Sequence, residues 1–422
     1  MQSDLDKNKA LCLAPWASVH TWPDGKTFPC CLWDSSDPIG NVNDSTLKEL
    51  WNSPKMKNAR LKMLAGEKVK SCNRCYSLED MGEGSYRQGI NKRHSKALSE
   101  LPKTNQDGSL DEMKLYLWDV RLSNFCNFKC RSCGVELSSS WHSDTLKLGA
   151  SLEQYPKALI NVSDRSSFLD MLEPHYQHVD EIYFAGGEPL LMPEHYTILN
   201  KLIELGRTDV MIRYSTNFSK LTFNKLHIFD LWKHFSNIQI YVSIDGVGKI
   251  GEYVRKGFND KEFETNIKSL IDSNFEPREL GYTITYGVLN YLHLFDLVLE
   301  FLKREYILPK YNPKHFRPLI FSPIENPPHY DCKFLPDRYK QAFKDRLENF
   351  HIELEYLKCT ESFIADIISK FTNIYNRSIS ESFNYSIMEK CVQITKQLDA
   401  IRGEKIQDTI PYYSNIEDLL KN

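Results

Sequence analysis

Three cysteines stand close together near the middle of the sequence: Cys126, Cys130 and Cys133, with the spacing C-x-x-x-C-x-x-C. Three thiolates on one loop can ligate three irons of a cubane [4Fe–4S] cluster. The fourth iron then has no protein ligand from this loop, and an open metal position can bind a substrate or a cofactor. A zinc site or three unrelated cysteines are the alternatives. The complete spacing, directly after a predicted strand, favours iron–sulfur.

A second group of cysteines lies near the start of the chain, and it ends in a C-x-x-C pair. Its members are Cys12, Cys30, Cys31, Cys72 and Cys75. Between the first two, the β-prone runs 19–22 and 27–28 flank Pro23-Asp24-Gly25-Lys26, and an Asp-Gly turn of this kind predicts a hairpin. Four thiolates on a hairpin and a following loop can close around one [4Fe–4S] cluster. A structural zinc ion is the alternative, since four thiolates suit zinc equally well.

The composition limits the classes of function. Apolar residues make up 41% and charged residues 26% of the 422 residues, which is typical of a soluble globular protein. A formal net charge of −3 argues against a chain held to nucleic acid by a basic field, so nucleic acid is not an expected partner. We find no signal peptide and no apolar run of about 18 residues, so we expect a cytoplasmic protein without a membrane span. In that reducing compartment, the eleven cysteines are better interpreted as ligands or catalytic groups than as disulfides.

The pattern of apolar residues predicts where the elements that carry these cysteines lie. Strands alternate with helices from about residue 112, which predicts an α/β fold with a parallel sheet, either doubly wound or a partial barrel. In both architectures the loops after the carboxyl ends of the strands carry the chemistry. We predict strands at 115–122, 181–185, 210–216, 238–244, 282–288 and 317–321, with helices at 194–205, 263–273 and 293–303 between them. We expect a cysteine-bearing module at residues 1–104, a core at 112–325 and a helical region at 326–422.

Short motifs follow the cysteine loop at the ends of the predicted strands. Gly186-Gly187-Glu188-Pro189 follows the second strand, and a strand end without side chains lets backbone carbonyls approach an amine. Together with the three cysteines, this segment resembles the radical S-adenosylmethionine (SAM) superfamily. The resemblance covers roughly residues 114–325. It implies a partial (β/α)6 TIM-like barrel, a SAM-binding [4Fe–4S] cluster and SAM itself as cofactors.

The resemblance also implies roles for residues around the cluster. Gly186, Gly187, Glu188 and Pro189 match the segment that binds the ammonium group of SAM. Asn217 ends the third strand, and Ser243 ends the fourth, where relatives contact the ribose or the carboxylate of SAM. Arg255 lies where many relatives place an arginine on that carboxylate, and a guanidinium fork suits this partner. This sequence departs from the family pattern at Ser132, since relatives usually place an aromatic residue just before the third cysteine.

The N-terminal cysteines resemble the auxiliary-cluster module called SPASM, or its shorter twitch form. The shared features are Cys12, a hairpin with G-x-x-x-x-C spacing from Gly25 to Cys30, an Ile-Gly-Asn turn and the closing Cys72–Cys75 pair. The resemblance implies an auxiliary [4Fe–4S] cluster on Cys12, Cys30, Cys72 and Cys75. Cys31 is the alternative to Cys30, and it faces the opposite side if the strand is regular. Relatives commonly carry this module after the barrel, whereas here it comes first.

The resemblance implies reductive cleavage of SAM to a 5′-deoxyadenosyl radical, which abstracts a hydrogen atom from the substrate. An auxiliary cluster favours a net oxidation. The first hypothesis for the substrate is a peptide or protein, and the alternative is a small molecule such as an amino sugar or nucleotide. We expect an electron donor such as flavodoxin or ferredoxin as a partner. A noncatalytic metal-binding scaffold stays open as a different class of function.

Overall fold

A computed structural model of the chain describes residues 8–82, 84–151, 165–273, 275, 277–307 and 318–422. The chain forms two compact units. The first unit comprises Met1–Phe125, Ala158–Ser215 and Thr222–Ile238, and the second comprises Cys126–Lys157, Thr216–Leu221 and Gln239–Asn422. The three domain ranges expected from the sequence stay a prediction.

The first unit opens with the predicted hairpin. Strand β1 (Ser18–Thr21) pairs antiparallel with β2 (Lys26–Phe28), and the turn between them contains Gly25 at a φ of 84°. Short helices lie on both sides of the hairpin. Helix α2 (Ala14–Ala17) precedes it, and strand β3 (Gly40–Asn41) follows it. The helices after β3 are α3 (Leu47–Trp51), α4 (Pro54–Leu64), η1 (Lys70–Cys72), α5 (Asn73–Asp80), α6 (Tyr86–Arg93) and η2 (Ser95–Lys103).

The hairpin is continuous with a parallel sheet in the same unit. Strand β1 pairs in parallel with β4 (Leu117–Val120), which places His20 opposite Asp119. Strand β4 pairs with β6 (Glu181–Phe184), and β6 pairs with β7 (Met211–Thr216), again in parallel. Strands β1 and β4 are buried at every position and β6 at all but one, which is typical of parallel strands that helices cover, whereas buried and half-buried residues alternate along β7. The unit also contains helices α8 (Arg165–Leu172), α9 (Pro193–Glu204) and α10 (Ile228–Trp232) and the small pair β8 (Thr222–Phe223) and β9 (Leu226–His227).

The second unit has its own three parallel strands. Strand β12 (Glu279–Tyr286) pairs with β10 (Ile238–Ser243) on one side and with β13 (Leu319–Pro323) on the other. A short antiparallel ribbon joins β5 (Lys129–Cys130) to β11 (Arg255–Lys256). The helices around these strands are α7 (His142–Lys147), α11 (Gly248–Val254), α12 (Asp260–Ile271) and α13 (Leu294–Lys303).

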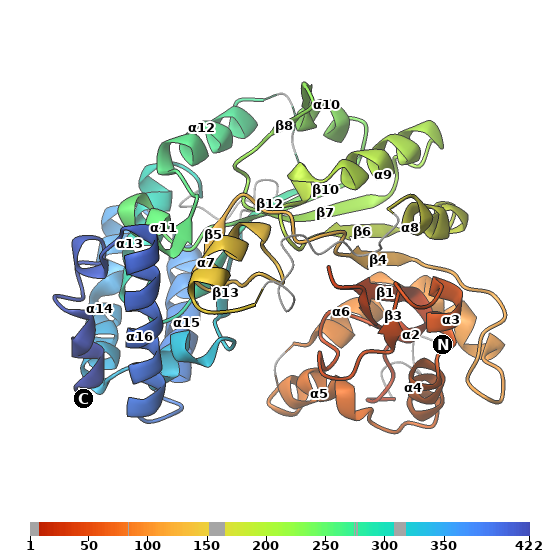
Figure 1. Ribbon diagram of the computed structural model, residues 1–422, viewed down its shortest axis with the longest axis horizontal. Helices are drawn as coiled ribbons and strands as arrows, with labels where there is room; N and C mark the ends of the chain where they lie inside the picture. Colours follow the sequence, from red (N-terminus) through yellow and green to blue (C-terminus); the bar gives the residue numbers. More distant parts are fainter. Residues whose placement is uncertain (1–7, 83, 152–164, 274, 276, 308–317) are drawn as a thin grey trace. The chain divides into compact units, whose positions relative to one another are not determined.

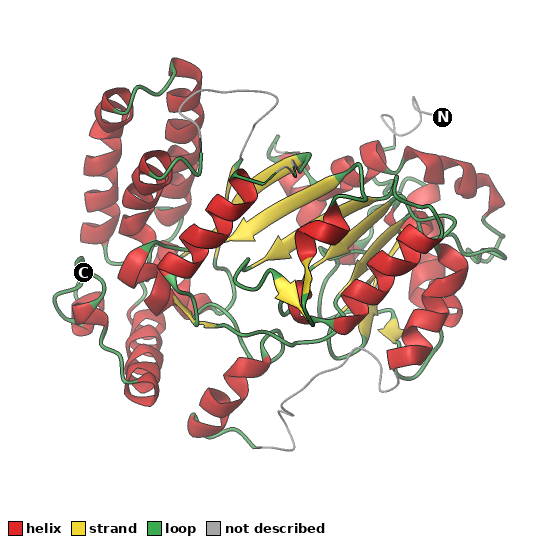
Figure 2. Ribbon diagram, turned by 90° about the horizontal axis from the view of Figure 1, so that it is seen from above, coloured by secondary structure: helices red, strands yellow, loops and turns green. Residues whose placement is uncertain are grey.

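Three long helices complete the second unit, within the region that the sequence predicts to be helical. They are α14 (Asp337–Tyr356), α15 (Glu361–Ser378) and α16 (Tyr385–Arg402), drawn in blue in Figure 1 and in red near the C-terminus in Figure 2. Phe343 of α14 and Phe371 of α15 pack against Phe295 of α13, with ring centroids 4.6 and 4.7 Å away. This aromatic cluster joins the C-terminal helices to the second unit's core.

The α/β class, the six parallel strands of the expected (β/α)6 fold, the N-terminal hairpin and helix module and the C-terminal helical region are confirmed. No helix in the described ranges is both long and apolar enough to cross a membrane.

Candidate functional site: two cysteine centres

Four N-terminal cysteines converge on one cavity in the first unit. Cys12, Cys30, Cys72 and Cys75 all line it, together with Leu32, Trp33, Tyr86 and Arg87. The cysteines come from four places in the chain. Cys12 precedes α2, Cys30 follows β2, Cys72 ends η1, and Cys75 lies in the first turn of α5. The structure therefore brings together the four residues that we predict to hold the auxiliary cluster.

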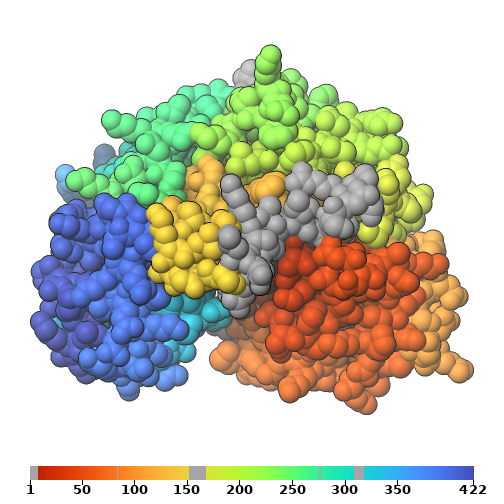
Figure 3. Space-filling view, viewed as in Figure 1, coloured from red at the N-terminus to blue at the C-terminus, as the bar shows by residue number. Residues whose placement is uncertain are grey.

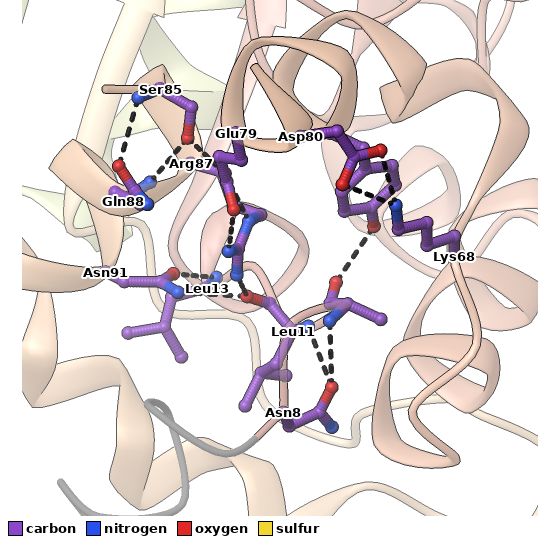
Figure 4. Close-up of polar contacts among 12 residues, drawn as sticks. Asn8, Leu11, Leu13, Lys68, Glu79, Asp80, Ser85, Arg87, Gln88 and Asn91 are labelled. Atoms are coloured by element: carbon purple, nitrogen blue, oxygen red, sulfur yellow. Dashed lines mark hydrogen bonds and ion pairs between the residues drawn. The ribbon is translucent and has the colours of Figure 1, made fainter. Parts of the chain in front are cut away.

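Helix α6 holds the segment that carries Cys12. The backbone carbonyl of Leu11 accepts hydrogen bonds from Nη1 of Arg87 at 2.6 Å and from Nδ2 of Asn91 at 2.9 Å. The N–H of Leu13 donates to Oδ1 of Asn91 at 2.8 Å, so both neighbours of Cys12 are fixed (Figure 4). Arg87 also donates from Nε to Glu79 of α5 at 2.9 Å. The arginine thus ties Cys12 to the helix that contains Cys75.

Cys12 and Cys75 are buried, Cys30 and Cys72 are half-buried, and burial changes the acidity of their thiols. Burial raises the pKa of Cys12 to about 12, against a smaller opposing effect from Arg87. Burial also raises the pKa of Cys30, Cys72 and Cys75. Thiols with raised pKa values are protonated at neutral pH, so metal binding must release protons from them. Four thiols around one cavity fit an iron–sulfur cluster, because the positive charge of its irons compensates the negative charge of the thiolates that form.

Cys31 does not line this cavity. Burial, helped by the carboxylate of Asp119, raises the pKa of Cys31 to about 12, and the side chain of Tyr86 is a hydrogen-bond partner. Asp119 is itself buried on β4, and its carboxylate lies 3.1 Å from Nδ1 of His20. Strand β2 ends at Phe28, and Cys30 and Cys31 lie in the bend and turn that follow, where the N–H of Trp33 donates to the carbonyl of Cys30 at 3.3 Å.

The other three cysteines lie on one loop in the second unit. Cys130 is buried in β5, whereas Cys126 and Cys133 are half-buried. Backbone contacts shape this loop: the hydroxyl of Ser140 donates to the carbonyl of Cys126 at 2.7 Å, and Nε1 of Trp141 donates to that of Cys130 at 2.9 Å. Burial raises the pKa of Cys133 to about 12 and also raises that of Cys130.

Two of the predicted SAM-binding residues lie beside this loop. Nδ2 of Asn217 is 3.0 Å from Oδ1 of Asn127 and 3.9 Å from Sγ of Cys126. Arg255 lies opposite Cys130 in the ribbon formed by β5 and β11. Its Nη1 is 2.9 Å from Oδ2 of Asp245, so an internal carboxylate already engages the guanidinium. Burial lowers the pKa of Arg255, but Cys130 and Asp245 outweigh that effect and hold it above its usual value.

Ser243, the third of these residues, ends β10, where it pairs with Thr283 of β12. Its side chain is half-buried. Its predicted contact with SAM stays a prediction.

The Gly-Gly-Glu-Pro segment follows β6 in the first unit. Gly187 has a φ of 56°, and a Cβ atom there would lie 2.4 Å from the carbonyl oxygen of Phe125. Gly186 has a φ of 77°, and a Cβ atom there would lie 2.9 Å from the side chain of Arg121. Both positions therefore require glycine. Glu188 is buried, and its carboxylate accepts from the N–H of Leu190 at 3.1 Å, where Pro189 opens a short 3-10 turn.

The donor sets fit iron–sulfur clusters. Among the residues that the structure describes, no three His, Cys, Asp or Glu side chains are arranged to hold a single metal ion. A [4Fe–4S] cluster spreads its thiolate ligands over four irons and does not need that degree of convergence.

Sequence reasoning missed the residues that support these cysteines, above all Arg87 and Asn91. A signal was present, because Ser85 and Gln88 form a capping box that starts α6, and this pattern can be read from the sequence. Nothing in the sequence indicated that the helix would reach the backbone on both sides of Cys12.

Comparisons with known proteins agree with the order of the two cysteine groups. Residues 12–76 match the iron–sulfur cluster-binding domain SPASM, and residues 120–291 match the radical SAM superfamily. The SPASM region therefore precedes the radical SAM region, as predicted. These matches confirm the expected cofactors, which are a [4Fe–4S] cluster with SAM in the radical SAM region and auxiliary iron–sulfur in the SPASM region.

No curated protein matches the chain. One solved structure, described as "Structure of TYW1 with a lysine-pyruvate adduct bound", is 13% identical over 44% of this chain and 59% of that chain, with a TM-score of 0.22. The match thus spans less than two thirds of that chain's length.

Proposed function

We propose that this chain, which carries a SPASM region before a radical SAM region, is an enzyme that oxidises a peptide or protein substrate by radical chemistry. The radical SAM region supports reductive cleavage of SAM in general. The observation that carries the finer proposal is the cavity with four cysteines in the first unit. Four thiolates complete the protein ligands of a [4Fe–4S] cluster, so this centre suits electron transfer better than direct binding of a substrate.

The residues of the cysteine loop have a different role. Cys126, Cys130 and Cys133 would hold three irons and leave the fourth for SAM, which supplies a 5′-deoxyadenosyl radical for hydrogen abstraction when it is cleaved. Gly187 keeps side chains away from the backbone that would meet the ammonium group of SAM. Asn217, next to Cys126, and Arg255, opposite Cys130, supply polar and positive groups for the carboxylate.

Net oxidation requires a place for one electron and one proton. A cluster held by Cys12, Cys30, Cys72 and Cys75 would supply an acceptor for the one electron that remains on the substrate after loss of a hydrogen atom and a proton. The chain's own contribution is to hold that cluster rigidly, through the bonds of Arg87 and Asn91 to the segment around Cys12. An external donor such as flavodoxin or ferredoxin would reduce the cluster that serves SAM, and we place the enzyme in the cytoplasm.

The fold and cofactors do not determine the substrate. A peptide or protein is the first candidate, because the enzymes that this module resembles include many that modify ribosomal peptides and proteins. A small-molecule dehydrogenase, acting on an amino sugar or nucleotide, is the second. A noncatalytic scaffold is disfavoured by the complete Gly186-Gly187-Glu188-Pro189 segment, since a scaffold has no need of a SAM site.

Anaerobic turnover with cell extract tests this proposal. The reconstituted enzyme, SAM and a reductant should yield 5′-deoxyadenosine, and mass spectrometry should find an extract peptide that has lost two hydrogens. Loss of two hydrogens from a small molecule would favour the second candidate. A Cys126→Ala variant is the control for background cleavage. If the parent protein binds iron but forms no more 5′-deoxyadenosine than this variant, the result would contradict the proposed enzyme and favour a noncatalytic scaffold.

A further inference from the structure

We propose that helix α16 is part of the site that holds the SAM-binding cluster, although it lies about 250 residues after the cysteine loop. Asp399 and Arg402 of this helix and the following Glu404 are here called the α16 clamp. The clamp fixes the loop of Cys126, Cys130 and Cys133 in its ligating shape before a cluster is bound. The inference rests on the proposed role of these cysteines and adds a function for the C-terminal region.

The end of α16 brings two carboxylates to one place. Gly403 ends the helix in the left-handed conformation, with a φ of 65°. The chain then turns back, so that the N–H of Glu404 donates to the carbonyl of Asp399 at 2.9 Å. A residue with a Cβ atom is disfavoured at this φ, and glycine is the usual solution at a helix end. The turn places the side chains of Asp399 and Glu404 around a common partner.

That partner is Arg131, which lies between the second and third cysteines of the loop. Its Nη2 is 2.5 Å from Oδ1 of Asp399 and 2.8 Å from Oε2 of Glu404. Its Nε donates to the carbonyl of Tyr253 at 3.2 Å, and its guanidinium lies 3.7 Å from the centre of the Tyr253 ring. The Arg131 side chain is only 1% exposed. A buried guanidinium needs its partners, so the loop depends on the two carboxylates.

Arg402 holds the loop from the opposite direction. Its Nε is 2.8 Å from Oδ2 of Asp144, and both side chains are buried. Oδ1 of Asp144 in turn lies 2.7 Å from Nζ of Lys129, the neighbour of Cys130. Arg402 also lies 4.8 Å above the ring of Trp141, whose Nε1 donates to the carbonyl of Cys130. In Figure 3 the yellow segment that includes α7 lies directly against the blue C-terminal helices.

The clamp also reaches the second strand of the ribbon. Oε1 of Glu404 is 2.7 Å from Nζ of Lys256, and Lys256 pairs with Lys129 across the ribbon. The next pair in the same ribbon is Arg255 with Cys130. Glu404 contacts Arg131, which follows Cys130, and Lys256, which follows Arg255. It therefore fixes the separation between the cluster ligand Cys130 and Arg255, the arginine proposed for SAM. Apolar packing of Leu398 and Ile394 against Val135, Trp141 and Cys133 closes the same interface.

The iron-free protein gives the most direct test. We would compare hydrogen exchange of residues 126–141 in the parent, an Asp399→Asn/Glu404→Gln variant and an Asp408→Asn control. Asp408 is exposed and lies just beyond the clamp. The two amide side chains keep the size of the carboxylates but remove their charges. We expect residues 126–141 to exchange at least about tenfold faster in the double variant, since hydrogen bonds between charged groups are lost. Exchange of residues 72–93 should not change. Equal protection of residues 126–141 in all three proteins would overturn the proposal.

A second measurement uses the reconstituted protein. A chelator should remove the cluster that responds to SAM several-fold faster from the double variant than from the control, whereas the auxiliary iron should leave at the parent rate. Equal losses of the SAM-responsive cluster would contradict the clamp. An Asp399→Glu variant, which keeps the charge, should lie closer to the parent, and a rate as fast as that of the double variant would also contradict it. If the parent binds iron without cleaving SAM, the proposed function fails, while hydrogen exchange of the iron-free protein still tests the clamp.

Discussion

The two cysteine centres are built in opposite ways. Around the first, four cysteines from four separate elements line one cavity, and α6 holds the chain on both sides of Cys12. Around the second, three cysteines come from one loop of eight residues, and the support comes from the β11 ribbon and from α16. A centre assembled from four separate segments can surround a cluster with four thiolates. A centre on a single loop keeps one side open, and this is what a cluster needs if it must bind a second cofactor.

The charges around the two centres differ as well. At the four-cysteine cavity, Arg87 is engaged with Glu79 and with the carbonyl of Leu11. At the three-cysteine loop, Arg255 pairs with Asp245 and lies opposite Cys130. The first arginine therefore supports the backbone that carries the ligands. The second presents a positive charge at the ribbon, where an anionic group of a ligand can compete with Asp245.

The strongest test of this difference removes one cysteine from the single loop. We expect Cys126→Ala to abolish SAM cleavage, because the fourth iron cannot be presented without its three partners. 5′-Deoxyadenosine would be measured by chromatography after anaerobic reconstitution. A Cys359→Ala variant is the matched control, since Cys359 is a half-buried single cysteine in the same unit. If Cys126→Ala forms 5′-deoxyadenosine at the parent rate, the ligand assignment is wrong.

The next test concerns the four-cysteine cavity. In a background with Cys126, Cys130 and Cys133 all changed to Ala, we expect about four irons per chain to remain, as one closed cubane requires. Adding Cys30→Ala should remove them, whereas adding Cys31→Ala should leave them in place, because Cys31 does not line the cavity. Iron and zinc would be measured by elemental analysis. Zinc in place of iron, or loss of the metal with Cys31→Ala instead, would contradict the assignment.

Much of this arrangement could be predicted from the sequence, because local patterns determine it. Long apolar runs between polar turns gave six strands whose positions agree with β4, β6, β7, β10, β12 and β13, although β12 begins three residues earlier than expected. The exact start of a helix is harder to predict. The sequence predicts Ser45 as a cap for the helix that begins at Leu47, and this is wrong: Thr46 caps it, because only Thr46 has a glutamate at the third following position to complete a capping box.

The contacts that support both centres could not be predicted in this way. Arg131 and Asp399 are 268 positions apart, and Arg87 meets Leu11 across 76 positions. No periodicity or short motif connects such pairs, since only the tertiary fold brings them together. The cysteines themselves have spacings that point to metal chemistry, whereas a supporting arginine has the same appearance in the sequence as any surface arginine.

A smaller effect is expected for Arg255, the arginine beside the three-cysteine loop. Arg255→Ala should weaken SAM binding by about 1–3 kcal/mol, the range for one charge-assisted hydrogen bond, and leave the iron content unchanged. The binding constant would be taken from the change in the cluster spectrum as SAM is added. Asp245→Asn removes the competing carboxylate and should not weaken SAM binding. An unchanged affinity in Arg255→Ala would remove Arg255 from the SAM site.

The mildest effect concerns acid stability of the first unit. Burial lowers the pKa of His195 to about 3, and its Nε2 lies 2.8 Å from the hydroxyl of Tyr214. The unfolded chain binds a proton at His195 near pH 6.5 and the folded chain does not, so stability is present above pH 6.5 and falls as the pH drops toward 3. The loss is up to about 1.4 kcal/mol per pH unit.

Thermal unfolding of the parent and of His195→Gln at pH 7 and pH 5 measures this effect. The parent should lose more stability than the variant between the two values, because glutamine does not titrate. Equal losses would mean that His195 is protonated in the folded chain. His227→Gln is a suitable control, since His227 also lies in the first unit but is only half-buried.

The parallel pairing of β1 with β4 has a practical consequence for work with shortened versions of this chain. Because His20 and Asp119 are neighbours in one ladder, a cut between the N-terminal module and the rest would leave β4 as a bare edge with its backbone groups unpaired. Leu117, Trp118 and Val120, now fully covered, would border that edge. Exposed apolar edges invite association between molecules, so a version that begins after residue 104 should aggregate rather than behave as an independent SAM-cleaving core.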